Sequence, residues 1–217
     1  MSKTALVAGA TGLIGDQLLD LVLEVSYYDK VIVLARRPVE KKSDKLTNLL
    51  ADFENLDTYA SQIKADDVYC CLGTTMKKAG SKAKFRQVDF NYTYQIAKLA
   101  HAGGAQQFLL ISALGADPKS SVFYNKVKGE VEEAITSMGF KCYHIFRPSL
   151  LIGQRNEMRL GEGLGKVFFS IFGFFFVGPL KKYKAIDSVK VARAMFAMAR
   201  QNKTGRFIHE SKELQKY

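Results

Sequence analysis

The chain has 217 residues, of which 47% are hydrophobic and 24% charged, a balance typical of one soluble domain with a sizeable core. Its net charge of +11 would suit nucleic acid or anionic lipid, but the lysines are spread out and no basic helix or RNA-binding signature is present. We therefore expect no nucleic-acid partner. Three cysteines without a CxxC spacing exclude a disulfide framework and a zinc site, and we expect no metal.

One segment raises the question of a membrane. The run from Val167 to Val177 contains six phenylalanines, but it is about half the ~20 apolar residues that a spanning helix needs. We expect no integral membrane span and interpret the run, within 164–177, as a roof or flank of the substrate pocket. A peripheral membrane contact is the less favoured alternative. Because Met1 leads almost directly into a strand-like run, we expect no secretory signal and a cytoplasmic protein.

Short apolar runs alternate with segments of helical periodicity along the chain. Helical segments of ten or more residues between strands predict βαβ units, and hence an α/β fold with a doubly wound parallel sheet. We expect a single domain over 1–217, with about 154–217 forming its substrate-side portion. The predicted helices are Leu13–Val25, Lys82–Ala102 and Val122–Met138. The predicted strands are Thr4–Ala8, Lys30–Ala35, Leu46–Ala51, Asp67–Leu72, Gln107–Ser112 and Lys141–Phe146.

A glycine-rich turn lies between the first predicted strand and the first predicted helix. In this context the GxxGxxG spacing predicts the dinucleotide-binding turn of a Rossmann fold rather than an ordinary strand-to-helix connection. One glycine permits the tight turn, the next admits the pyrophosphate, and the third allows close packing of the helix on the sheet. The N–H groups at the start of the helix would bind the phosphates. The residues predicted to form this site are Gly9, Ala10, Thr11, Gly12, Leu13, Ile14 and Gly15.

The residues at the end of the second predicted strand indicate whether NAD or NADP is the preferred dinucleotide. An acidic residue there would accept hydrogen bonds from the ribose hydroxyls of NAD, but this chain has Arg36 and Arg37 instead. Guanidinium groups pair well with a 2′-phosphate. The sequence therefore predicts NADPH as the preferred cofactor.

Three residues form a candidate catalytic group. Tyr124 and Lys128 are four positions apart and so lie on one face of a predicted helix, a spacing that also arises by chance on helix surfaces. Ser112 ends the fifth predicted strand, twelve positions before Tyr124. With the glycine-rich turn in the same chain, these residues resemble the Ser–Tyr–Lys triad of the short-chain dehydrogenase/reductase superfamily.

Arg147-Pro148-Ser149-Leu150-Leu151-Ile152-Gly153 resembles a stretch that lies along the nicotinamide in the extended and atypical branches of that superfamily. Other motifs resemble one atypical branch, the HIV-Tat-interacting oxidoreductase-like group. They are Leu72-Gly73-Thr74-Thr75, Ala79-Gly80 and Tyr124 with Lys128-Gly129-Glu130-Val131-Glu132. The resemblance implies that Tyr124 protonates a carbonyl oxygen, Ser112 holds that oxygen, and Lys128 favours the phenolate form and binds the nicotinamide ribose. It also implies that five other residues line the cofactor, namely Leu72, Gly73, Thr74, Arg147 and Pro148.

One position departs from the wider pattern. Extended members of the superfamily usually carry Val-Asn before the helix that supports the active site, whereas this chain has Val88-Asp89. If the asparagine takes part in a proton relay, an aspartate alters that relay.

Three functions fit these residues. The favoured one is an NADPH-dependent carbonyl reductase acting on a small or lipophilic substrate. The second is a non-catalytic NADP(H)-binding sensor or regulatory protein. A sugar-nucleotide epimerase or dehydratase is the least favoured, because about sixty residues after Gly153 are too few for a separate substrate lobe.

Overall fold

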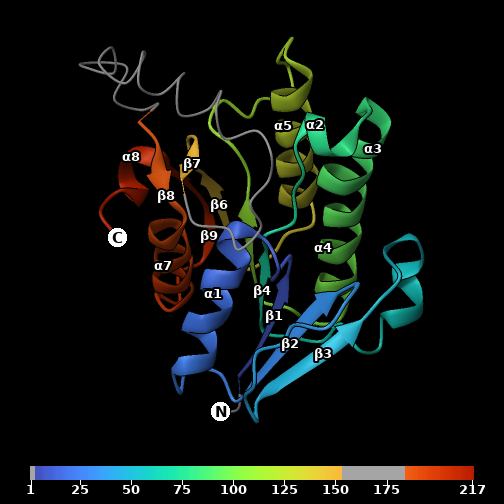
Figure 1. Cartoon of the computed structure of the whole chain (residues 1–217), viewed down its shortest axis with the longest axis vertical. Helices are drawn as coiled ribbons and strands as arrows, with labels where there is room; N and C mark the ends of the chain where they lie inside the picture. The colour runs from blue at the N-terminus through green and yellow to red at the C-terminus, as the bar shows by residue number, and fades with distance from the viewer. Residues whose placement is uncertain (1–2, 153–183) are drawn as a thin grey trace.

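A computed structural model describes residues 3–152 and 184–217. Seven parallel strands form one sheet in the order β3-β2-β1-β4-β5-β6-β9, which confirms the predicted doubly wound α/β fold (Figure 1). The central strands begin and end close to where their apolar runs do, because both faces of the sheet are covered there. The strands are β1 (Thr4–Ala8), β2 (Lys30–Ala35), β3 (Leu46–Leu50), β4 (Asp67–Cys70), β5 (Gln107–Ile111), β6 (Cys142–Arg147) and β9 (Gly205–Glu210).

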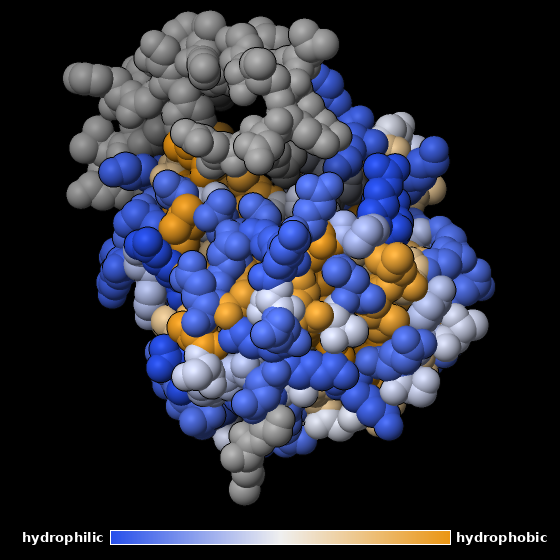
Figure 2. Space-filling view, turned by 60° about the horizontal axis from the view of Figure 1, so that its bottom comes forward, coloured by the Kyte–Doolittle hydropathy of each residue, from blue (hydrophilic) through white to orange (hydrophobic). Residues whose placement is uncertain are grey.

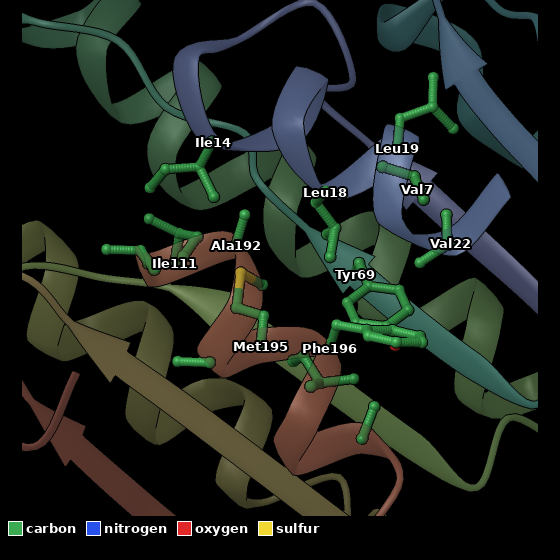
Figure 3. Packing of buried hydrophobic residues seen from close by; sticks show 14 of the residues in the cluster. Val7, Ile14, Leu18, Leu19, Val22, Tyr69, Ile111, Ala192, Met195 and Phe196 are labelled. Atoms are coloured by element: carbon green, nitrogen blue, oxygen red, sulfur yellow. The ribbon is translucent and has the colours of Figure 1, made fainter. Parts of the chain in front are cut away.

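Helices α1 (Leu13–Glu24) and α7 (Ser188–Ala199) cover one face of the sheet, and α4 (Thr93–Ala102) and α5 (Phe123–Thr136) cover the other. Figure 3 shows how α1 and α7 meet: Leu18 and Val22 of α1 lie opposite Met195 and Phe196 of α7, with Tyr69 of β4 beside them. A second apolar cluster fills the space between the sheet and the α4–α5 layer. The outside is more polar, and the face in Figure 2 is largely hydrophilic with smaller hydrophobic patches.

Shorter elements complete the fold. A 3₁₀ segment, η1 (Phe53–Tyr59), follows β3, the short helices α2 (Met76–Ala79) and α3 (Lys82–Arg86) follow β4, and α8 (Ser211–Leu214) follows β9. A separate small ladder pairs β7 (Leu151–Ile152) with β8 (Ile186–Asp187). The predicted helix Lys82–Ala102 is divided, because a π-helical segment, η2 (Gln87–Tyr92), lies between α3 and α4. Such segments occur frequently at functional sites.

The described C-terminal elements α7, β9 and α8 belong to the body of the fold. Strand β9 pairs with β6 along its whole length, and α7 packs against α1. Apolar side chains of α7, such as Val191 and Met195, are buried. That about 154–217 form a substrate-side portion stays a prediction. The expectation for residues 164–177 lies outside the described residues. Within the described ranges, no helix is both long and apolar enough to cross a bilayer.

Candidate functional site

The glycine-rich turn lies at the carboxyl end of β1, between β2 and β4, and its geometry requires glycine. Gly9 has φ +83°, and a Cβ there would lie 2.6 Å from the carbonyl carbon of Cys71. A Cβ at Gly15 would lie 2.2 Å from the carbonyl oxygen of Gly9. The first turn of α1 can therefore approach the strand ends closely, which leaves room for a pyrophosphate against the backbone.

The start of α1 offers unsatisfied backbone donors. Gly12 is its N-cap, and none of the described side chains caps it, so the N–H groups that follow are available to an anion. Of the other residues in this turn, Ala10 and Ile14 are buried, Leu13 is half-buried and Thr11 is exposed. The residues present thus fit a dinucleotide phosphate group.

Arg36 and Arg37 follow β2 directly, and both are exposed. Because β2 runs parallel to β1, the end of β2 lies at the same edge of the sheet as the glycine-rich turn. The arginines are therefore on the side of the turn where an adenosine ribose would lie in this fold.

Three polar residues of α5 recur every four positions: Tyr124, Lys128 and Glu132. The first two were predicted as site residues, and Glu132 was not. Residues at this spacing share one helix face. Lys128 and Glu132 are buried, and Tyr124 in the first turn is half-buried, with its ring 5.3 Å from that of Phe85 on α3. The face carrying these residues lies towards the carboxyl ends of β4, β5 and β6, as the following contacts show.

Lys128 forms a buried ion pair with Asp89 of η2. The distance from Lys128 Nζ to Asp89 Oδ1 is 2.8 Å, and both side chains are at most 5% exposed. Burial, the largest single influence, would lower the pKa of Lys128, but the charge and hydrogen bond of Asp89 together with Tyr124 and Cys70 outweigh it, and the pKa is raised above its usual value. Lys128 is thus a buried cation. Its Nζ also lies 3.4 Å from the carbonyl oxygen of Ile111, at the end of β5.

Asp89 also binds the loop after β4. The backbone N–H of Thr74 donates to Asp89 Oδ2 at 2.9 Å. A Cβ on Gly73 would lie 3.4 Å from Asp89 Oδ1 and 3.7 Å from Lys128 Nζ, so the loop passes directly over the ion pair. Leu72, which precedes this glycine, is half-buried. One carboxylate therefore joins two segments that the sequence predicted to contact the cofactor.

Ser112 has a different partner. Its hydroxyl donates a hydrogen bond to Oε1 of Glu132. Glu132 also accepts from both sides of the Arg147 guanidinium, with Nε to Oε1 at 3.1 Å and Nη2 to Oε2 at 2.5 Å. These hydrogen bonds raise the pKa of Arg147 above its usual value. Ser112 and Arg147, predicted to hold substrate and cofactor respectively, are thus joined to each other by Glu132.

The predicted residues accordingly form two groups. Lys128 lies with Asp89, Gly73 and the backbone of Thr74, while Ser112 lies with Glu132 and Arg147. Pro148 is buried beside the second group, and its carbonyl oxygen accepts a hydrogen bond from the N–H of Leu114. Glu132 was not predicted to be a site residue, although its position four residues after Lys128 places it on the same helix face.

Comparisons with known proteins agree with this geometry. A family model described as NAD(P)H-binding matches residues 9–164. A rat protein named HTATIP2 is 40% identical over 172 residues, which cover 77% of this chain and 71% of that protein. A Coccidioides immitis protein named FMP52, mitochondrial, is 31% identical over 208 residues, covering 89% of this chain and 84% of that protein. The first relative confirms the resemblance to the HIV-Tat-interacting oxidoreductase-like group.

Solved structures with a similar fold include two that contain UDP-glucose. MoeE5 in complex with UDP-glucose and NAD superposes with a TM-score of 0.70 and 16% identity, over 94% of this chain and 74% of that one. A UDP-glucose 4-epimerase from Thermotoga maritima, with UDP-glucose, gives a TM-score of 0.71 and 15% identity, over 98% and 80% of the two chains. At these identities the likeness shows the fold alone.

Proposed function

The chain belongs to the NAD(P)H-binding family, and from that premise we propose that it is an NADPH-dependent oxidoreductase that reduces a carbonyl group on a small or lipophilic substrate. The observation that carries the proposal is the buried ammonium of Lys128, which lies one helical turn after Tyr124 and beside the end of β5. A buried cation needs a compensating partner, and buried groups with shifted pKa values cluster at functional sites.

Each part of the site would have a separate task. The N–H groups at the start of α1 would bind the pyrophosphate, Arg36 and Arg37 the 2′-phosphate, and Lys128 the nicotinamide ribose. When bound, NADPH supplies a hydride to the substrate carbon. Tyr124 would donate its phenolic proton to the substrate oxygen, and the ammonium of Lys128 would favour the phenolate that remains.

The contacts of Ser112 support a second candidate. Its hydroxyl proton is directed to Glu132, so Ser112 can hold a substrate oxygen only after that hydroxyl turns away from the carboxylate. If the hydroxyl keeps its partner, the chain binds NADP(H) without acting on a carbonyl, as a sensor or regulatory protein would. An epimerase is the least favoured of the three functions. We continue to expect a cytoplasmic location.

Replacing Tyr124 tests the reductase. Tyr124→Phe should leave NADPH affinity nearly unchanged, because the lost hydroxyl acts on the substrate oxygen, while turnover should fall by ~10²–10⁴-fold. Lys128→Ala should weaken both NADPH binding and turnover. Activity is found by a screen of aldehydes, ketones and quinones that follows NADPH absorbance. A wild-type chain that binds NADPH but reduces nothing would favour the sensor, and undiminished turnover in Tyr124→Phe would assign the chemistry to other residues.

The proposed cofactor preference has its own test. Fluorescence titration should show tighter binding of NADPH than of NADH. Replacing Arg36 and Arg37 by alanine should remove the preference, at a cost of ~2–5 kcal/mol in NADPH binding if the contacts to the 2′-phosphate are charge-assisted and partly desolvated. Affinity for NADH should change little in the same variant. Equal affinities in the wild type would contradict this assignment of the arginines.

A further inference from the structure

Asp89 places a negative charge inside the site. It is 1% exposed, and it contacts both Lys128 Nζ, at 2.8 Å, and the backbone N–H of Thr74, at 2.9 Å. The π-helical turn η2 brings this carboxylate into the fold, whereas Asn91 two positions later is exposed. The contact with Lys128 is direct, so the two charges offset each other within the site.

The titratable groups around this pair contribute little net charge. Cys70 of β4 lies near both Lys128 and Asp89, and burial raises the pKa of its thiol to about 11, so the thiol is neutral. Tyr124 faces Lys128 from the same helix. Glu132, one turn further along α5, is itself paired with Arg147. The described interior of the site is therefore close to neutral as a whole, although it contains four charged side chains.

We propose that Asp89 is a positioning residue that sets the balance between oxidised and reduced cofactor by neutralising the charge of Lys128 at the nicotinamide end of the site. This inference rests on the proposed function for the place of Lys128 beside the nicotinamide ribose. The oxidised nicotinamide ring carries a positive charge and the reduced ring carries none. An uncompensated ammonium would repel the oxidised ring, whereas the neutral Lys128–Asp89 pair discriminates far less between the two forms.

The test compares dissociation constants for NADP⁺ and NADPH in matched variants. In Asp89→Asn the site gains one positive charge, and the ratio of the NADP⁺ constant to the NADPH constant should rise about tenfold, or ~1.4 kcal/mol. Calorimetry or fluorescence at pH 6.5 keeps the Lys128 ammonium charged during the measurement. Glu130→Gln is the matched control, because it removes a carboxylate of α5, the helix of Lys128, that is paired with Arg86 near the surface, and it should leave the ratio unchanged.

Two further variants keep the test decisive if Asp89→Asn does not fold. Lys128→Met, measured at pH 8, leaves the charge of Asp89 without a partner. It should lower the ratio of the NADP⁺ constant to the NADPH constant. The double variant Asp89→Asn with Lys128→Met contains no buried charge at the pair and should restore the wild-type ratio. Charge neutralisation predicts this pattern of opposite shifts and restoration, which a loss of packing does not produce.

The outcomes separate this inference from the proposed reductase. If Asp89→Asn and Lys128→Met weaken both cofactor forms equally, or if Glu130→Gln shifts the ratio as much, the inference is overturned and Asp89 is structural. If the ratios shift as expected but no carbonyl is reduced, the inference stands and the reductase fails. Binding of neither form would overturn both.

Discussion

Two polar regions of this molecule accommodate buried titratable groups in opposite ways. At the carboxyl ends of β5 and β6, the carboxylate of Glu132 is paired with Arg147 and also accepts from Ser112. On β6 and β9, by contrast, a cysteine and two histidines form a hydrogen-bonded row that ends on a glutamate of α8. Cys142 Sγ lies 3.2 Å from His144 Nε2, His144 Nδ1 lies 2.9 Å from His209 Nε2, and His209 Nδ1 lies 3.1 Å from Glu213 Oε1.

The difference lies in how each region avoids an isolated buried charge. The first region keeps its charges and pairs them, so each charge depends on its partner. The second keeps its two β6 members neutral: burial raises the pKa of Cys142 to about 11, and burial with the neighbouring His209 and Lys203 lowers the pKa of His144 to about 4. Mutating one partner of the paired region should therefore lower the free energy of unfolding. In the neutral row, the free energy of unfolding should instead depend on pH.

The largest effect on stability should come from breaking the pair. Glu132→Gln keeps the shape of the side chain but leaves Arg147 without a countercharge. Since Arg147 is 19% exposed, we expect a loss of about 3 kcal/mol in the free energy of unfolding, at the low end for buried pairs. Urea denaturation measures it. The control is Glu213→Gln, the same substitution on a side chain that is 42% exposed, which should cost less than ~1 kcal/mol. If the two variants lost the same free energy of unfolding, the paired region would not depend on its charges more than the neutral row does.

A smaller effect, spread over a range of pH, should come from the neutral row. The unfolded chain protonates His144 near its usual pKa of about 6.5, but the folded chain does so only near 4. Between these values the unfolded state binds more protons, so stability is full above about pH 6.5 and falls as the pH drops towards 4, by at most about 3 kcal/mol. Urea denaturation at pH 7.5 and 4.5 measures this loss. The non-titrating variant His144→Gln should lose correspondingly less on acidification, and an identical loss would assign the effect to other groups.

Features that depend on local sequence could be predicted, and those that depend on contacts between distant segments could not. Strands β1 and β2 match their predicted bounds, because apolar runs closed by a glycine or by arginines are local signals. The glycine-rich turn and the Tyr124–Lys128 spacing are local too. Strand β9 was missed because it is an edge strand, buried on one face, and GRFIHE contains no continuous apolar run. The site contacts of Glu132 and Asp89 join segments far apart in the chain, so spacing alone did not reveal them.

The π-helical turn η2 also bears on how the chain can be altered. A π turn contains one more residue than an α turn, and it is bracketed here by α3 and α4, which continue on either side in α-helical form. Removing a single residue from Gln87–Tyr92 would let the three segments merge into one ordinary helix without a break in the backbone. Because the π turn itself contains the extra residue, α3 and α4 would keep their orientation relative to each other. The deletion would change only the placement of residues within the turn, and Asp89, which pairs with Lys128, is one of them.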